Sequence, residues 1–248
     1  MPHACPGRCE QPDLGFEFSM AFQPIVDVPA QRIFAHEALV RGINREPVGE
    51  VLQRINDQNR YAFDQCCRRR AIQLAASLHL DTYLSINFLP NAVYQPETCI
   101  RATLAAASEF NFPKDKLIFE VTEGEKVENK AHLQNIICEY KRLGFKTAID
   151  DFGAGYAGLN LLAEFQPDII KIDMDLTQGI ESDLPRQAIV RSIVMVCNEL
   201  GIEIIAEGVE SRAELEVLRG FGIRLFQGFY LARPAFEALP VVDWAAIA

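Results

Sequence analysis

Short apolar segments that resemble strands alternate with helix-like segments along most of this 248-residue chain. The strand-like segments are residues 19–26, 31–40, 83–88, 117–121, 147–149, 169–172, 202–206 and 224–226. Apolar residues at helical spacing mark residues 48–56, 61–80, 100–109, 131–143, 159–165, 186–200 and 212–221. Such alternation is typical of βα units around a parallel sheet. Because about eight strands occur without a linker, the pattern predicts an α/β chain closed into a (β/α)8 TIM-type barrel.

The opening of the chain departs from this pattern. Its first two strand-like segments are joined by a Pro-containing turn at residues 27–30, whereas an ordinary barrel places a helix after its first strand. We therefore expect a modified barrel in a domain spanning residues 18–248. Residues 1–17 are predicted to be irregular. His3, Cys5 and Cys9 lie there, but without a CxxC pair they favour a flexible segment over a structural metal site.

The amino-acid composition limits the kinds of molecule that this chain can bind. The net charge of −10 argues against binding to nucleic acid polymers, although an acidic protein can still bind a small anion through cations. No apolar run approaches the ~20 residues that a membrane helix needs, and residues 1–15 lack the layout of a secretory signal. Seven cysteines do not resemble a disulfide framework. We expect a soluble cytoplasmic protein with reduced thiols and no membrane contact.

Two adjacent carboxylates, Asp150 and Asp151, end one of the strand-like segments. Like charges at a strand end repel each other, and a divalent cation is a common way to stabilise such a pair. Taken alone, the pair is more typical of solvated aspartates that cap the next helix. The other strand ends must decide between these interpretations.

Polar residues interrupt or end most of the other predicted strands, where burial is costly without a partner. They are Glu37, Arg41, Asn87, Glu120, Lys171, Asp173, Glu207 and Gln227. Any one of them could form a core hydrogen bond or a salt bridge within the barrel. Together they direct carboxylates, amides and one lysine toward the barrel mouth, where catalysis takes place in this fold. An oxygen-rich set without His or Cys favours Mg²⁺ or Mn²⁺ over zinc.

Two further patterns have alternative interpretations. Gly153, Gly155 and Gly158 spell GxGxxG after a strand, with Asp173 further on, as in a dinucleotide-binding turn. The adjacent aspartates would repel a pyrophosphate there, so we interpret the glycines as a tight loop beside a metal-bound ligand. The run Arg68–Arg70 could form a phosphate patch. Because consecutive helical positions point in different directions, a solvated face or a subunit contact is the favoured interpretation.

The same residues resemble the EAL-domain cyclic-di-GMP phosphodiesterases over roughly residues 18–240. The matching motifs are Glu37-Ala-Leu-Val-Arg41, Asn87, Glu120-Val-Thr-Glu123, Asp150-Asp-Phe-Gly-Ala-Gly, Lys171-Ile-Asp173, Ala206-Glu-Gly-Val-Glu210 and Gln227-Gly, with Gln23-Pro-Ile-Val in the first strand. This resemblance implies a barrel with an antiparallel opening strand. It also implies hydrolysis of one phosphodiester of cyclic-di-GMP to linear pGpG, assisted by two Mg²⁺ or Mn²⁺ ions.

The resemblance also implies a role for each matching residue. Glu37, Asn87, Glu120 and Asp150 would hold one cation, and Asp150 would bridge to a second cation held with Asp151. Glu207 and Gln227 would bind or orient metal-bound water. Glu207, Lys171 and Glu37 are the expected catalytic residues, with Glu207 as a candidate base and Lys171 holding the attacking water or the developing negative charge. Gln23, Leu39, Arg41 and Asp173 would contact the dinucleotide, and Glu123 would anchor the loop after Asp151.

The loop after Asp151 departs from the family's pattern, which bears on rate and regulation more than on the type of reaction. The family's loop commonly reads Gly-Thr-Gly-Tyr-Ser-Ser-Leu, whereas this chain has Gly153-Ala-Gly-Tyr-Ala-Gly-Leu159. The alternative to an enzyme is a catalytically silent cyclic-di-GMP receptor that signals through a partner protein. Receptors usually lack a metal ligand, and every one is present here, which favours the enzyme. The family further suggests a homodimer, with Leu159, Leu161, Leu162 and Phe165 as possible contacts, unless the helix layer buries them.

Overall fold

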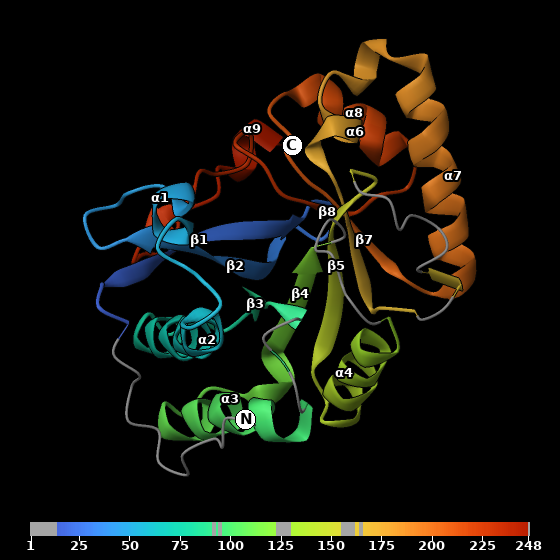
Figure 1. Cartoon of the computed structure of the whole chain (residues 1–248). Helices are drawn as coiled ribbons and strands as arrows, with labels where there is room; N and C mark the ends of the chain where they lie inside the picture. The colour runs from blue at the N-terminus through green and yellow to red at the C-terminus, as the bar shows by residue number, and fades with distance from the viewer. Residues whose placement is uncertain are drawn as a thin grey trace.

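A computed structural model describes residues 14–90, 93, 96–122, 130–154, 162–163 and 166–247 of the chain. Its strands form one sheet in the order β2-β3-β4-β5-β6-β7-β8-β1-β9, and β1 also pairs with β2, which closes the barrel (Figure 1). The strands are β1 (Phe18–Asp27), β2 (Arg32–Gly42), β3 (Tyr83–Asn87), β4 (Leu117–Thr122), β5 (Lys146–Phe152), β6 (Ile169–Ile172), β7 (Glu203–Ala206), β8 (Leu225–Phe226) and β9 (Ala235–Phe236). The predicted barrel is confirmed.

The opening strand has the predicted unusual direction. β1 runs antiparallel to both of its barrel neighbours, β2 and β8, while every pairing from β2 to β8 is parallel. Two antiparallel strands need only a short connection, which the turn at residues 28–31 provides. In consequence, the amino-terminal part of β1 lies at the end of the barrel where the parallel strands finish.

Helices surround the barrel and connect its strands (Figure 1). They are α1 (Val48–Leu52), α2 (Arg60–Ser77), α3 (Pro96–Glu109), α4 (Lys130–Arg142), α6 (Met174–Thr177), α7 (Leu184–Leu200), α8 (Arg212–Gly220) and α9 (Trp244–Ile247), with 3₁₀ turns at Lys114–Lys116 and Ile180–Ser182. None of these helices is long and apolar enough to cross a membrane.

Some helix boundaries differ from the sequence-based ones. The helix expected over residues 48–56 ends at Leu52, because the Asn56 side chain instead accepts the Gln58 backbone N–H at 2.9 Å. α3 begins four residues earlier than expected, at Pro96, a residue whose fixed φ suits the first turn of a helix. The short helix α6 was not predicted, and the Asp173 side chain caps it by accepting the Asp175 N–H at 2.7 Å.

Apolar side chains fill both faces of the sheet. One cluster packs inside the barrel at its amino-terminal end and consists of Ile25, Ala35, Ile118, Ala148, Ile169, Ile205 and Leu225. A larger cluster lies between the sheet and the surrounding helices. Because the strands are buried on both faces, they read as nearly continuous apolar runs. The polar residues that interrupt those runs therefore stand out.

The arginine run on α2 is not the solvated face that was favoured. Arg68 is fully buried, pairs with Asp64 at 2.7 Å, and donates to the Tyr140 hydroxyl at 2.8 Å. Arg69 forms two hydrogen bonds with Glu109, and Arg70 pairs with Glu237. The prediction was wrong for Arg68 because one helical position in such a run must face the barrel, and here its charge has a buried partner.

The different environments of two neighbouring arginines predict different effects on stability. Arg68→Met should lower the free energy of unfolding by about 3–5 kcal/mol, because it leaves the Asp64 carboxylate buried without its partner. The matched control Arg69→Met breaks a half-exposed pair and should cost about 1 kcal/mol or less. Urea denaturation measures both. Equal losses for the two variants would contradict the prediction.

Candidate active site

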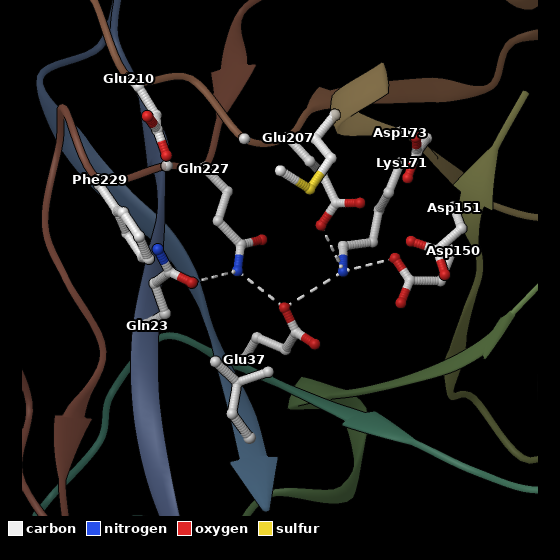
Figure 2. A pocket seen from close by; sticks show the side chains of 14 residues that line it. Gln23, Glu37, Asp150, Asp151, Lys171, Asp173, Glu207, Glu210, Gln227 and Phe229 are labelled. Carbon is white, nitrogen blue, oxygen red and sulfur yellow. Dashed lines mark hydrogen bonds and ion pairs between the residues drawn. The ribbon is translucent and has the colours of Figure 1, made fainter. Parts of the chain in front are cut away.

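The ammonium group of Lys171, at the end of β6, lies at the centre of the barrel mouth (Figure 2). Its Nζ lies 2.8 Å from Asp150 Oδ1, 2.8 Å from Glu207 Oε1, 3.0 Å from Glu120 Oε2 and 3.2 Å from Glu37 Oε2. These carboxylates come from β5, from the loop after β7, from β4 and from β2. Lys171 is 1% exposed, so the buried ammonium needs this ring of opposite charge.

Glu37 is held in place by amides on both sides. Its Oε1 accepts Asn87 Nδ2 at 2.8 Å, and its Oε2 accepts Gln227 Nε2 at 2.7 Å. The same Gln227 nitrogen also donates to Gln23 Oε1 at 3.2 Å, and Gln23 is directly opposite Glu37 in the β1–β2 register. The antiparallel direction of β1 thus places Gln23 at the mouth together with residues from the ends of parallel strands.

An irregularity in β5 brings two neighbouring carboxylates to the same cavity. Adjacent residues of a regular strand point to opposite faces. Here the β5–β6 register shifts between Ile149 and Phe152, and Asp151 has φ of 54°, a left-handed conformation that non-glycine residues rarely adopt. Asp150 and Asp151 accordingly both line the cavity. Backbone strain of this kind costs of order 1–3 kcal/mol and is typical of functional sites.

The site contains more carboxylates than one ammonium group can neutralise, and the pKa values of its residues are shifted as a result. Burial raises the pKa of Glu120 to about 8, with a further rise from the charges of Glu37 and Asp150, although Lys171 acts in the opposite direction. Burial, followed by the charges of Asp150 and Asp173, also raises the pKa of Asp151 to about 6. Burial disfavours the charged form of Lys171, but the surrounding carboxylates outweigh it and raise its pKa. Additional positive charge would stabilise this arrangement.

The donor set fits divalent cations. Two groups of carboxylates have ligand oxygens within 4.8 Å of one another, namely Glu37, Glu120 and Asp150, and Asp150, Asp151 and Glu207. When all five carboxylates are ionised, as cation binding requires, the single ammonium leaves four negative charges without a partner, which equals the charge of two divalent ions. In addition, Gln227 Oε1 is buried without a hydrogen-bond partner among the described residues. Such oxygens suit Mg²⁺ or Mn²⁺.

Two glycines allow the loops that carry Glu207 and Gln227 to approach closely. A Cβ at Gly228 would lie 2.0 Å from the Val209 carbonyl oxygen, and one at Gly208 would lie 2.4 Å from Met174 Cβ. Gly208 also has φ of 64°. The Thr177 hydroxyl of α6 donates to the Glu207 carbonyl oxygen and fixes this loop from the other side.

The remaining predicted residues have different placements. Leu39 and Asp173 line the cavity. Arg41 lies on the same face of β2 as Glu37. Its Nη1 donates to the carbonyl oxygen of the preceding residue, Val40, and Arg41 does not line the cavity. Glu123, Gly155 and Gly158 lie outside the described residues. So do three of the four proposed dimer contacts, Leu159, Leu161 and Phe165, whereas Leu162 is buried.

The structure adds residues that the sequence analysis did not single out. The Ser85 hydroxyl donates to Glu120 Oε1 at 2.5 Å inside the barrel. Its position two residues before Asn87 on β3 places both on one face, which the strand period could have indicated. Met174, Glu210 and Phe229 also line the cavity (Figure 2). Met174 begins the short helix α6, and Glu210 and Phe229 come from loops, so no strand or helix period points to them.

The sequence profile of the EAL domain family matches residues 13–234. Among curated relatives, the "Blue light- and temperature-regulated antirepressor BluF" of Escherichia coli is 34% identical over 90% of this chain and 56% of its own length. The "Cyclic di-GMP phosphodiesterase PdeR" of the same species is 37% identical over 57% of this chain and 22% of its own length. The chain thus spans about half or less of these relatives.

Two solved structures are similar over nearly the whole chain. A standalone EAL protein from Vibrio cholerae in a c-di-GMP-bound form is 54% identical, with a TM-score of 0.89 over 92% of this chain and 96% of that one. A manganese and cy-diGMP complex of Klebsiella pneumoniae BlrP1 is 35% identical, with a TM-score of 0.86 over 98% of this chain and 62% of that one.

The ring of carboxylates around Lys171 predicts a metal-dependent change in stability. In metal-free protein, Lys171→Met should lower the melting temperature by about 10 °C, because four carboxylates lose their shared counter-charge. Mn²⁺ should restore most of this loss, because it supplies the missing positive charge. Calorimetry with and without a chelator measures both effects.

Lys146→Met is the matched control, because Lys146 begins β5 at the opposite end of the barrel and its Nζ lies 5.6 Å from the ring centre of Tyr83. Its melting temperature should fall by about 2 °C or less and should not respond differently to Mn²⁺. The prediction would be contradicted if metal-free Lys171→Met protein had the same melting temperature as the metal-free wild type.

Proposed function

This chain belongs to the EAL domain family, and we propose that it hydrolyses one phosphodiester of cyclic-di-GMP to linear pGpG, which lowers the level of this second messenger. The observation that carries the proposal is the complete set of carboxylates around Lys171, in two groups that share Asp150. The relative named as a phosphodiesterase and the solved neighbours with c-di-GMP support the choice of substrate.

In this proposal, Glu37, Asn87, Glu120 and Asp150 hold one Mg²⁺ or Mn²⁺. Asp150 and Asp151 hold the second, with Glu207 and Gln227 completing the site. When bound, the two cations supply Lewis acidity and activate water for an in-line displacement. The manganese complex of the Klebsiella pneumoniae protein and the unpaired charge of the donor set support this assignment.

The side chains around the cations have distinct roles in the displacement. Water attacks the phosphorus while the bond to the 3′ oxygen of one ribose breaks, and a proton is delivered to that oxygen. Glu207 is the candidate base, since its carboxylate lies at the cavity beside Lys171. The Lys171 ammonium orients the attacking water or stabilises the charge that develops on the phosphoryl oxygens.

Residues around the rim position the dinucleotide. Gln23 and Leu39 line the cavity next to Glu37, and Asp173 lines it on the other side of Lys171. We assign substrate contacts to these three residues. Arg41, half-buried further along β2, would leave its present hydrogen bond to the Val40 carbonyl and donate to the ligand. Glu123 is assigned to anchor the loop after Asp151.

A cyclic-di-GMP receptor without catalytic activity is the second candidate function. The name of BluF as an antirepressor favours it, because that name describes an action on another protein. Against it, the carboxylates expected to bind metal are all present in this chain. A receptor would bind the dinucleotide tightly and release no product, and it would need a regulatory protein partner.

The decisive experiment incubates the purified chain with cyclic-di-GMP and Mg²⁺ or Mn²⁺ and separates the products by chromatography. We expect pGpG. Glu37→Ala should reduce the rate by more than about 100-fold, because it removes a ligand itself, whereas loss of an outer-shell partner costs 10–100-fold. Glu203→Gln, at the other end of the barrel, should leave the rate unchanged. Tight binding without pGpG under any metal would establish the receptor instead.

We also propose a homodimer that acts in the cytoplasm. The described cysteines, Cys66, Cys67, Cys99, Cys138 and Cys197, are free, which is consistent with a reducing compartment. Light scattering at micromolar concentration should give twice the chain mass of 27.8 kDa. A mass of one chain across this concentration range would rule the dimer out.

A further inference from the structure

A buried ion pair lies outside the barrel, behind the strands that carry two of the proposed metal ligands. Asp64 and Arg68 are one helical turn apart on α2, and their charged groups are 2.7 Å apart. Asp64 is 3% exposed and Arg68 is fully buried. The mechanism proposed above uses neither residue, so their burial calls for another explanation.

A hydrogen bond connects the ion pair to the backbone that follows β3, next to the active site. Asp64 Oδ1 accepts the Leu89 N–H at 3.0 Å, and Leu89 lies two residues after Asn87. Between them, the Phe88 N–H donates to the Glu120 carbonyl oxygen at 3.0 Å. The chain that leaves β3 is therefore fixed by one hydrogen bond to β4 and by one to the Asp64 carboxylate.

The guanidinium group of Arg68 packs against side chains adjacent to both ligands. It lies 5.5 Å from the ring centre of Phe88, which follows Asn87, and 5.3 Å from that of Phe119, which precedes Glu120. Strand alternation turns these rings outward and the two ligands inward. Tyr140 completes the cluster, because its hydroxyl accepts a hydrogen bond from Arg68. The guanidinium holds Asp64 beneath Leu89 and supports both strand ends.

We propose that Asp64 is a positioning residue for the side of the metal centre formed by Asn87, Glu37 and Glu120. Its carboxylate oxygen fixes the Leu89 N–H, and thereby the backbone of Asn87, whose amide donates to Glu37 at 2.8 Å. The inference rests on the proposed function. It goes further by assigning a role in metal binding to a residue on a helix outside the barrel.

Packing of α2 alone does not account for this arrangement. Replacing a buried ion pair by apolar residues of similar volume is often neutral or stabilising, so packing of α2 does not require these charges. What an apolar side chain cannot provide is an acceptor for the Leu89 N–H. Outer-shell hydrogen bonds of this kind typically change metal affinity by 10–100-fold.

The experiment compares two double variants that both remove the ion pair. Asp64→Asn with Arg68→Met keeps an oxygen that can accept the Leu89 N–H. Asp64→Leu with Arg68→Met has the same branched arrangement of side-chain heavy atoms but lacks this oxygen. Because neither variant buries an unpaired charge, both should fold, and circular dichroism and thermal melts check this. Calorimetric titration of metal-free protein with Mn²⁺ alone then measures site number and affinity.

We expect two Mn²⁺ sites in the wild type. The variant with Asn should bind Mn²⁺ at both sites with affinities within a few-fold of the wild-type values. In the variant with Leu, one of the two sites should weaken by about 10–100-fold. Equal Mn²⁺ affinities in the two folded double variants would overturn the inference and leave the proposed function intact. A wild-type protein that binds no Mn²⁺ would overturn the proposed metal centre and the inference together.

A further arm tests whether Asp64 acts through Asn87. In an Asn87→Ala background, the difference in Mn²⁺ affinity between the two double variants should disappear, because the ligand being positioned is already absent. Their difference in melting temperature should persist, because it comes from the buried Leu89 N–H. An affinity difference that persists without Asn87 would show that Asp64 acts on another ligand and would overturn the assignment.

Discussion

The attraction between one buried ammonium group and four carboxylates holds the mouth of this barrel together. Lys171 lies within 3.2 Å of Glu37, Glu120, Asp150 and Glu207, which come from separate elements of the chain. Without a shared cation, these carboxylates would repel one another in a poorly solvated site. The same ring remains short of positive charge, and this shortage makes it suited to divalent cations. Structural support and cation binding thus have one electrostatic origin.

Several irregular features of the backbone serve this arrangement. Asp151 adopts a left-handed conformation at a register shift in β5, so two neighbouring carboxylates share a cavity. Gly228 allows the loop after β8 to approach Val209, where any side chain would clash. Antiparallel β1 brings Gln23 opposite Glu37. In each case a departure from the regular barrel places one more polar group at the mouth. The packing of the apolar layers around the sheet offsets the free energy that the irregular backbone costs.

The sequence predicted the barrel well because its evidence is local. Strand and helix periods, and the paired opening strands, depend on which faces are buried, and this is visible in the order of apolar residues. Helix ends were less predictable. α1 stops at Leu52 because Asn56 competes for backbone hydrogen bonds, and the buried charge of Arg68 could not be recognised without its partners Asp64 and Tyr140. Glu120 was found from the sequence, whereas its partner Ser85 was not.

The sequence by itself determined which residues end the strands, and therefore the chemical kind of the site, because parallel strands of a barrel finish at one mouth. Only the tertiary structure decided how those residues meet. It places Lys171 between the carboxylates, divides them into two groups that share Asp150, and leaves Arg41 outside the cavity lining. It also brings Asp64 beneath the chain that follows Asn87. These contacts join residues far apart along the chain, and their distances depend on strand register and packing, which no local pattern encodes.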